Sequence, residues 1–136
     1  MKSTKAVIDT NVFVSGIFFS GPPCRILNAW NDELVQVALS EEIIVEYRRV
    51  VNLLSAKLKN VNFDSVFEPL LMKTELVGPC YLKEPVCQDP DDDKFIACAI
   101  ASRCQYIISG DKHLLDVGKY NKINIVTPRY FVDNLL

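Results

Sequence analysis

Short apolar runs alternate along the chain with longer stretches in which apolar residues recur every three to four positions. The short runs predict buried strands, and the periodic stretches predict helices with one buried face. We expect strands over residues 6–9, 77–82, 106–109 and 123–126, and either a strand or a helical turn over residues 34–39. We expect a turn into helix over residues 12–20 and helices over residues 22–31, 40–54, 63–71, 89–103 and 128–134. This alternation indicates a three-layer α/β/α domain, in which helices cover both faces of a central parallel sheet of about four to five strands.

Two prolines and one serine refine these boundaries. Pro69 lies inside the helix expected over residues 63–71 and should kink that helix or break it near Glu68. Pro79 lies inside the strand expected over residues 77–82, so this strand should be short or at an edge of the sheet. Ser40 should cap the helix that follows it, because a serine hydroxyl at this position accepts a hydrogen bond from a free backbone N–H.

Composition adds limits on size and location. The chain has 136 residues, of which 49% are hydrophobic and 24% are charged, and its net charge is −2. These values are typical of one globular domain, which we place over residues 1–136. The near-neutral charge is compatible with a polyanionic partner but does not argue for one. No apolar run approaches the ~20 residues that a membrane span needs, and no signal peptide is recognisable. We therefore expect a cytoplasmic protein without membrane association.

The five cysteines are expected to be free thiols. Their number is odd, no pair has the CxxC spacing, and the chain has a single histidine. A zinc site of cysteines and histidines would need a spacing that is absent here. Cys98 lies in the apolar segment 95–100 and should be a core residue.

Acidic residues stand at the ends of two predicted strands and at the start of one predicted helix. Asp9 ends the first strand and Asp111 follows a later one, and functional groups gather at the carboxyl ends of parallel strands. The segment 89–93 contains four aspartates. Each position has a structural alternative, with Asp9 in an Asx-turn, Asp111 as the cap of a helix over residues 112–117, and the first aspartate of the run as another helix cap. Capping needs only one carboxylate of the run, however, and four crowded carboxylates repel one another unless a cation compensates them.

Glu46 lies on or beside the buried face of its predicted helix, where a glutamate is costly unless it is paired. It either pairs with Arg48 or Arg49, or it points into the same pocket as Asp9. If these acids converge, all the ligand atoms are oxygens, which favours Mg²⁺ or Mn²⁺ over zinc. Two such ions stabilise the attacking and the leaving oxygen of a phosphodiester and generate hydroxide from bound water. The constellation therefore predicts metal-assisted phosphodiester hydrolysis.

Four segments together resemble a known family. They are Val7–Val12, Ser40 with Glu46 and Tyr47 in the following helix, Asp89–Phe95, and Ile107–Asp111. In this order and spacing, and over nearly the whole chain, they resemble the PIN-domain ribonucleases. The likeness is greatest to the prokaryotic PIN-family toxin components of VapBC-like toxin–antitoxin pairs.

The resemblance implies a role for each matching residue. The acids that would hold the metal and carry the catalysis are Asp9, Glu46, Asp92 and Asp111. Asp93 is the rival of Asp92, because the run of aspartates allows a shift of one residue, and Asp89 would be an outer metal ligand. Asn11 would organise the loop beneath the first acid, and Ser109 would donate a hydrogen bond within the acidic set.

The resemblance also implies a reaction and partners. The family uses Mg²⁺ or Mn²⁺ to activate water for the cleavage of RNA. Its toxin members are commonly homodimers and are silenced by an antitoxin protein encoded alongside. We expect the same of this chain, and the apolar residues of the segment 52–75 are candidates for the dimer or antitoxin contact.

Three other readings stay open from the sequence. A haloacid-dehalogenase-like phosphatase also has an aspartate after its first strand, but it needs a second acid at the position of Asn11. A two-component receiver domain would have two adjacent acids after the first strand and an acceptor aspartate in mid-chain, which we do not find. A non-catalytic RNA- or protein-binding module on the same fold would not need the complete acidic set.

Contacts to the substrate are less visible. Seven basic residues could contact RNA phosphates but are expected to be mainly solvated surface charges. They are Arg48, Arg49, Lys57, Lys59, Lys94, Lys112 and Lys119. His113 adjoins Asp111, but a metal-bound hydroxide needs no separate base.

Overall fold

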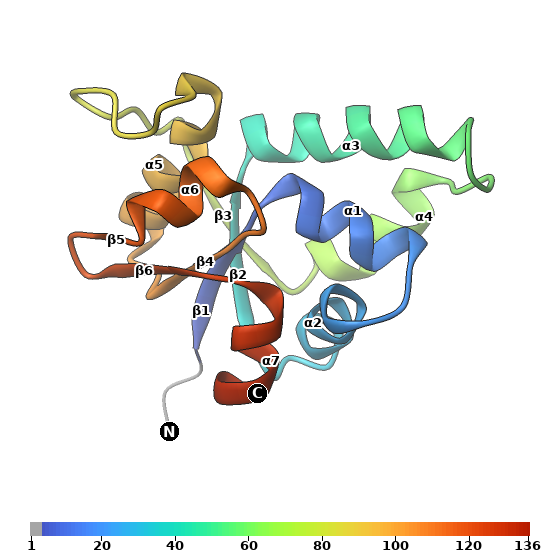
Figure 1. Ribbon diagram of the computed structural model, residues 1–136. Helices are drawn as coiled ribbons and strands as arrows, with labels where there is room; N and C mark the ends of the chain where they lie inside the picture. Colours follow the sequence, from blue (N-terminus) through green and yellow to red (C-terminus); the bar gives the residue numbers. More distant parts are fainter. Residues whose placement is uncertain (1–3) are drawn as a thin grey trace.

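The computed structural model describes residues 4–136, and in this part of the chain six strands form one sheet (Figure 1). The strands are β1 (Lys5–Ile8), β2 (Gln36–Ser40), β3 (Thr74–Val77), β4 (Tyr106–Ile108), β5 (Lys119–Tyr120) and β6 (Ile123–Val126). Their order in the sheet is β3-β2-β1-β4-β6-β5, and every neighbouring pair is parallel except β5 with β6. The carboxyl ends of β2, β1 and β4 therefore lie side by side at one edge of the sheet.

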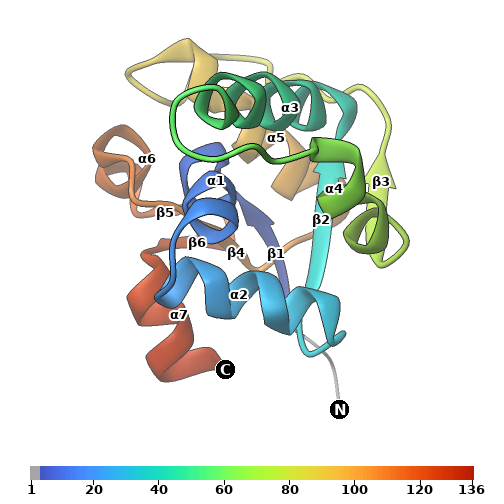
Figure 2. The same cartoon turned by 90° about the vertical axis from the view of Figure 1, so that its right-hand side faces the viewer.

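Seven α-helices in the described residues cover the two faces of this sheet (Figures 1 and 2). They are α1 (Thr10–Phe18), α2 (Pro22–Asn31), α3 (Glu41–Ser55), α4 (Phe63–Leu71), α5 (Asp93–Ser102), α6 (Lys112–Val117) and α7 (Pro128–Leu135), and a 3₁₀ turn, η1 (Pro90–Asp92), precedes α5. Helix α5 packs on strands β1 to β4 and α6 packs on β6, whereas α1 to α4 lie on the opposite face and α7 packs against α2. This confirms the α/β fold with helices on both faces of a mostly parallel sheet.

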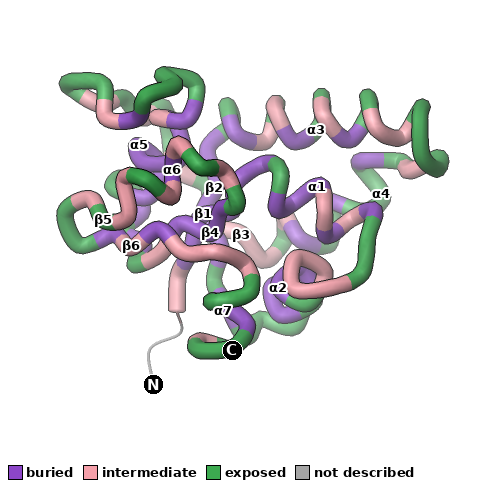
Figure 3. The backbone as a smooth tube through the Cα atoms, in the orientation of Figure 1, coloured by how far each residue is buried: buried purple, intermediate pink, exposed green. Residues whose placement is uncertain are grey.

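The core continues from the sheet into an aromatic cluster beneath α3 (Figure 3). The rings of Phe13 in α1 and Tyr47 in α3 stack with their centroids 4.1 Å apart, and Phe67 in α4 meets both rings edge-on. The hydroxyl of Tyr47 donates a hydrogen bond to the carbonyl oxygen of Ile8, the last residue of β1. The packing of the helices thus fixes the end of β1, the place from which Asp9 projects.

The number and position of the strands differ from the sequence prediction. The sheet has six strands instead of four to five, because the two-residue strand β5 pairs with β6 and is too short to leave a hydrophobic pattern. The strand expected over residues 77–82 lies instead over Thr74–Val77. It ends before Gly78 and Pro79, since proline has no N–H to donate to a strand ladder.

Helix boundaries were predicted more closely, with two exceptions. The break expected at Pro69 was wrong, because α4 continues through Pro69 and ends two residues later, at Leu71. Proline has no N–H, so the carbonyl oxygen of Ser65 loses its helical hydrogen bond, but Ser65 lies at the exposed surface. The helix expected over residues 89–103 begins as the 3₁₀ turn η1 and becomes α-helical at Asp93. The cap by Ser40 is confirmed, since its Oγ accepts a hydrogen bond from the N–H of Ile43 at 3.4 Å.

Two further expectations concern cysteines and membranes. All five cysteines are free, and Cys98 is fully buried, as predicted. Among the helices of residues 4–136, none has both the length and the apolar character needed to cross a membrane.

Candidate metal centre

Three carboxylates meet at the carboxyl end of the sheet. Asp9 follows β1 directly and is buried, and its N–H donates a hydrogen bond to the carbonyl oxygen of Ile108, the last residue of β4. Asp111 follows β4 after two residues, and Asp92 approaches from η1 at the start of α5. The parallel pairing of β1 with β4 brings together residues about a hundred positions apart in the sequence.

Ser109 links Asp9 to Asp111. Its Oγ donates a hydrogen bond to Oδ2 of Asp9 at 2.7 Å and accepts one from the backbone N–H of Asp111 at 2.9 Å. Burial raises the pKa of Asp9, and the negative charges of Asp111 and Glu46 raise it further, against the lowering effect of the Ser109 hydroxyl. A cation placed beside Asp9 would relieve both the burial cost and the repulsion.

Asp92 has an unpaired buried oxygen. The residue is 8% exposed, and its Oδ2 is buried without a hydrogen-bond partner in the described structure. Burial, followed by the charges of Asp111, Asp89 and Asp9, raises its pKa to about 6, although His113 opposes the shift. A buried polar atom normally has a partner, so this oxygen is the strongest single indication of a missing ligand.

His113 stands between two of the acids. Its Nδ1 lies 3.7 Å from Oδ2 of Asp92 and 3.7 Å from Oδ1 of Asp111. One ligand atom each from Asp89, Asp92 and His113 can be chosen so that all three lie within 4.8 Å of one another. The site can therefore offer one nitrogen in addition to its oxygens. Asp111 also caps α6, because its Oδ1 accepts a hydrogen bond from the N–H of His113 at 2.8 Å. Asp111 therefore serves both as the predicted helix cap and as a carboxylate of the site.

Glu46 also reaches this end of the sheet, but both of its oxygens are held by protein groups. Lys94 Nζ lies 2.7 Å from Oε1 of Glu46, and the hydroxyl of Thr10 donates a hydrogen bond to Oε2. The pairing with Arg49 that the sequence allowed is present only as a loose contact of 3.9 Å, and Arg48 pairs with Asp64 instead. Glu46 thus lies close enough to Asp9 for its charge to raise the pKa of Asp9, and Lys94 is its counter-ion.

The expectation that Lys94 is a solvated surface charge was wrong. Its side chain is only 5% exposed, because it extends from α5 into the acidic pocket. Thr10 is buried as well, at the first position of α1. The sequence held one signal for Lys94, since it is the only basic residue within the segment 89–95, where four aspartates need a counter-charge.

The remaining predicted residues lie at the edge of the pocket or turn away from it. Asp93, the rival of Asp92, accepts hydrogen bonds from the backbone N–H groups of Val86 and Cys87, the shortest of them 2.7 Å, and so anchors the loop before α5. Asp89 is exposed and accepts a hydrogen bond from the N–H of Asp91. Asn11 is exposed at the start of α1. Of the two adjacent aspartates, Asp92 is the one whose charge interacts with Asp9 and Asp111.

A groove opens beside this pocket. It has a volume of about 440 Å³ and lies between the start of α3 and the segment 78–81, with Lys94 at one end. Tyr81 lines it and is 86% exposed. Glu41 and Glu42 line it as well, so the groove suits an uncharged ring better than a phosphate.

The residues present fit a hard divalent cation. The ligand atoms at the strand ends are carboxylate oxygens, which Mg²⁺ and Mn²⁺ prefer, and Oδ2 of Asp92 has no hydrogen-bond partner in the described structure. The cysteine nearest to the pocket does not change this, because burial and Asp93 raise the pKa of the Cys87 thiol to about 12 and keep it protonated. With a cation bound, the site would supply a metal-activated water for hydrolysis.

Comparison with known proteins agrees with this fold and site. The PIN domain family model matches residues 5–113, a range that contains all four acids of the site, and the chain belongs to this family. It is similar to an uncharacterized protein of Methanocaldococcus jannaschii, with 34% identity over 145 aligned positions that cover 95% of this chain and 90% of the relative. PIN domains are generally nucleases that hydrolyse phosphodiester bonds and typically depend on divalent metal ions.

Proposed function

We propose that the protein is a Mg²⁺- or Mn²⁺-dependent endoribonuclease. The observation that carries this proposal is the buried Oδ2 of Asp92, which has no hydrogen-bond partner and lies among the charges of Asp111, Asp89 and Asp9. Asp9, Asp92 and Asp111 hold the metal, Glu46 completes the acidic set, and Ser109 orients Asp9. A cation held there would supply an activated water for hydrolysis of the phosphodiester bond of RNA.

Each protein group contributes a separate step. The serine hydroxyl and the backbone around Asp9 fix the carboxylate that binds the metal, which is the usual role of outer-shell hydrogen bonds. His113 lies within reach of two acids and adds a nitrogen donor, which suits Mn²⁺ better than Mg²⁺. Single-stranded RNA fits the open groove, because unpaired bases stack on exposed aromatic side chains such as Tyr81.

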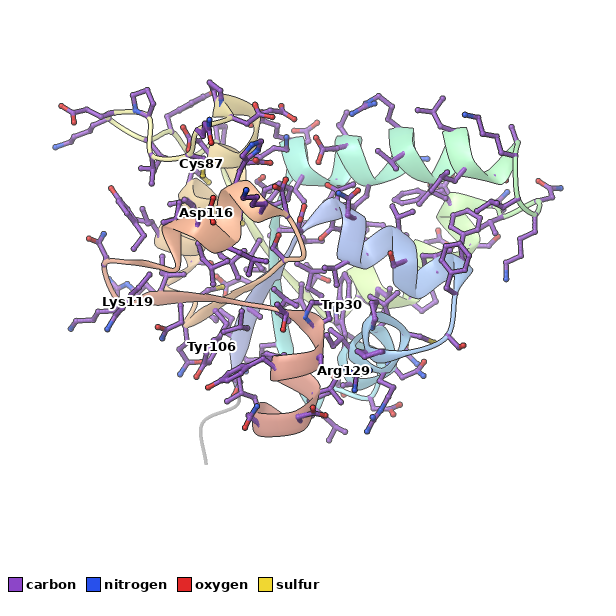
Figure 4. The ribbon with its side chains drawn as sticks, viewed as in Figure 1. Trp30, Cys87, Tyr106, Asp116, Lys119 and Arg129 are labelled. Carbon is purple, nitrogen blue, oxygen red and sulfur yellow. The ribbon has the colours of Figure 1, made fainter. Side chains whose placement is uncertain are left out.

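The direct test is RNA degradation with purified protein. The wild type with Mn²⁺ should cleave single-stranded RNA, EDTA should stop the cleavage, and Asp9→Asn should reduce it at least ~100-fold. The matched control is Asp116→Asn, an exposed aspartate on α6 (Figure 4), which should retain wild-type activity. Cleavage that survives in Asp9→Asn would point to a contaminating nuclease. Hydrolysis of small phosphomonoesters without RNA cleavage would support a phosphatase, and RNA binding without cleavage would support a binding module.

We further propose that this nuclease is the toxin of a toxin–antitoxin pair in the cytoplasm, on the basis of its resemblance to VapBC-like toxins. The proposal includes a homodimer and a cognate antitoxin protein. It is supported by apolar side chains that remain exposed in the segment 52–75, namely Leu53, Leu58, Val66 and Met72. Expression of the wild type should arrest growth, expression of Asp9→Asn should not, and the product of a neighbouring gene should relieve the arrest. Light scattering of the purified protein tests the dimer.

A further inference from the structure

Lys94 is a buried cation inside the acidic pocket. Its Nζ lies 2.7 Å from Oε1 of Glu46, 3.1 Å from Oδ1 of Asp91 and 2.8 Å from the carbonyl oxygen of Asp91. An ammonium has three N–H donors, and these three contacts use all of them. Lys94 is therefore not free to bind a substrate phosphate while these contacts hold.

Glu46 differs from the other acids of the site in its surroundings. One of its oxygens faces the ammonium of Lys94, and the other accepts the hydroxyl hydrogen of Thr10. Asp92, by contrast, has an oxygen with no partner. A dication that approached Glu46 would have to come close to a fixed positive charge, whereas a dication at Asp92 would meet only negative charge and the histidine.

We propose that Lys94 is a positioning residue that acts as a built-in cation. It keeps Glu46 out of the coordination sphere, so that the site binds one divalent cation, through Asp9, Asp92 and Asp111. This inference rests on the proposed function, because it concerns the same metal site. It implies that the pocket binds a single divalent cation, because Glu46 is already paired with Lys94.

The test is the number of Mn²⁺ ions bound per chain, measured by isothermal titration calorimetry on protein stripped with EDTA. The wild type should bind one ion. Lys94→Met, which keeps the length of the side chain and removes its charge, should bind two, because Glu46 becomes available. The matched control Lys112→Met removes the same charge from an exposed lysine next to Asp111 and should still bind one ion.

Three further variants keep the test decisive if Lys94→Met does not fold. The double variant of Lys94→Met with Glu46→Gln removes both members of the ion pair and should bind one ion. Glu46→Gln alone should bind one ion with a Kd within about threefold of the wild type, whereas Asp92→Asn should weaken binding by at least ~10-fold.

The possible outcomes separate this inference from the proposed function. A wild type that binds two ions, a folded Lys94→Met that binds only one, or a Glu46→Gln that loses Mn²⁺ as severely as Asp92→Asn would each overturn the role of Lys94 and leave the metal-dependent nuclease intact. A wild type that binds no Mn²⁺ at millimolar concentration would overturn the proposed function itself, and the role of Lys94 with it.

Discussion

The ionised carboxylate of Asp92 should reduce the stability of the metal-free protein. Removing its negative charge should therefore stabilise the fold. The carboxylate is buried, lacks a partner for Oδ2, and faces the charges of Asp9, Asp89 and Asp111. In Asp92→Asn the charge disappears while the size and shape of the side chain are retained. We expect this variant to be more stable than the wild type at neutral pH in EDTA, although it loses the metal.

The size of the effect follows from the pKa shift. Burial and the nearby carboxylates raise the pKa of Asp92 from 3.8 to about 6, against the opposing effect of His113. A shift of this size corresponds to at most ~3 kcal/mol, since one pKa unit is worth ~1.4 kcal/mol. Water reaches the neighbouring acids and screens part of the repulsion, so we expect a gain of about 1 to 2 kcal/mol in the free energy of unfolding. In a chain of this size that gain raises Tm by roughly 4 to 8 °C.

The dependence on pH has a definite sign. Between about pH 4 and pH 6 the folded protein binds more protons at Asp92 than the unfolded chain does, so its stability falls as the pH rises. The penalty is complete above the folded pKa and absent below the unfolded pKa. The difference in Tm between Asp92→Asn and the wild type should thus be largest at pH 7 to 8 and should disappear near pH 4.

Thermal unfolding followed by circular dichroism measures both effects. In EDTA at pH 7.5, Asp92→Asn should melt above the wild type. In Mn²⁺ the order should reverse, because a ligand at 100 times its Kd stabilises the folded state by about 2.7 kcal/mol, and only the wild type binds it well. Asp93→Ala is the control at the neighbouring aspartate and should be destabilised in both buffers, since it removes the acceptor for two backbone N–H groups. Destabilisation of Asp92→Asn in EDTA, or a gain that does not depend on pH, would refute this reasoning.

Three other substitutions test single contacts of the site. Ser109→Ala should weaken Mn²⁺ binding by about tenfold in calorimetry, because Asp9 loses the hydrogen bond that orients it. His113→Gln should reduce the preference for Mn²⁺ over Mg²⁺ in competition titrations, because the nitrogen donor is lost. Tyr81→Ala should raise KM for single-stranded RNA by roughly fivefold or more with little change in kcat, because a stacking surface is removed away from the reacting atoms.

Each of these results has a counterpart that would contradict it. Unchanged Mn²⁺ affinity in Ser109→Ala would mean that Asp9 does not need its partner. An unchanged metal preference in His113→Gln would remove the histidine from the site. A Tyr81→Ala that lowers kcat with KM constant would mean that the tyrosine acts on the chemistry and not on binding, and Tyr81→Phe, which keeps the ring, should behave as the wild type.

The sequence predicted the parts of the fold that depend on continuous local patterns. The buried strands β1 and β4 and the cap at Ser40 follow from residues that are neighbours in the chain. The position of β3 did not follow, because Thr74–Val77 contains Thr74 and Glu75 and is stabilised by pairing with β2 and by the ion pair of Glu75 with Lys5. A strand at the edge of a sheet depends more on pairing with its neighbour than on its own hydrophobicity. The pattern of hydrophobic residues along the chain does not contain that pairing.

The acidic residues of the site could be predicted from the sequence, but the burial of Lys94 among them could not. Asp9 and Asp111 follow buried strands, and parallel strands place such residues at one edge, so topology alone brings them together. The local sequence shows only that Lys94 stands among four aspartates, and its burial depends on Glu46, which lies 48 positions earlier on another helix. An acidic cluster read from a sequence therefore overstates the charge left for metal ions, because a lysine from a neighbouring element can neutralise one carboxylate. In this protein the pairing of Glu46 with Lys94 changes the expected stoichiometry from two metal ions to one. The number of ions bound per chain is therefore a sharper test than the presence of bound metal.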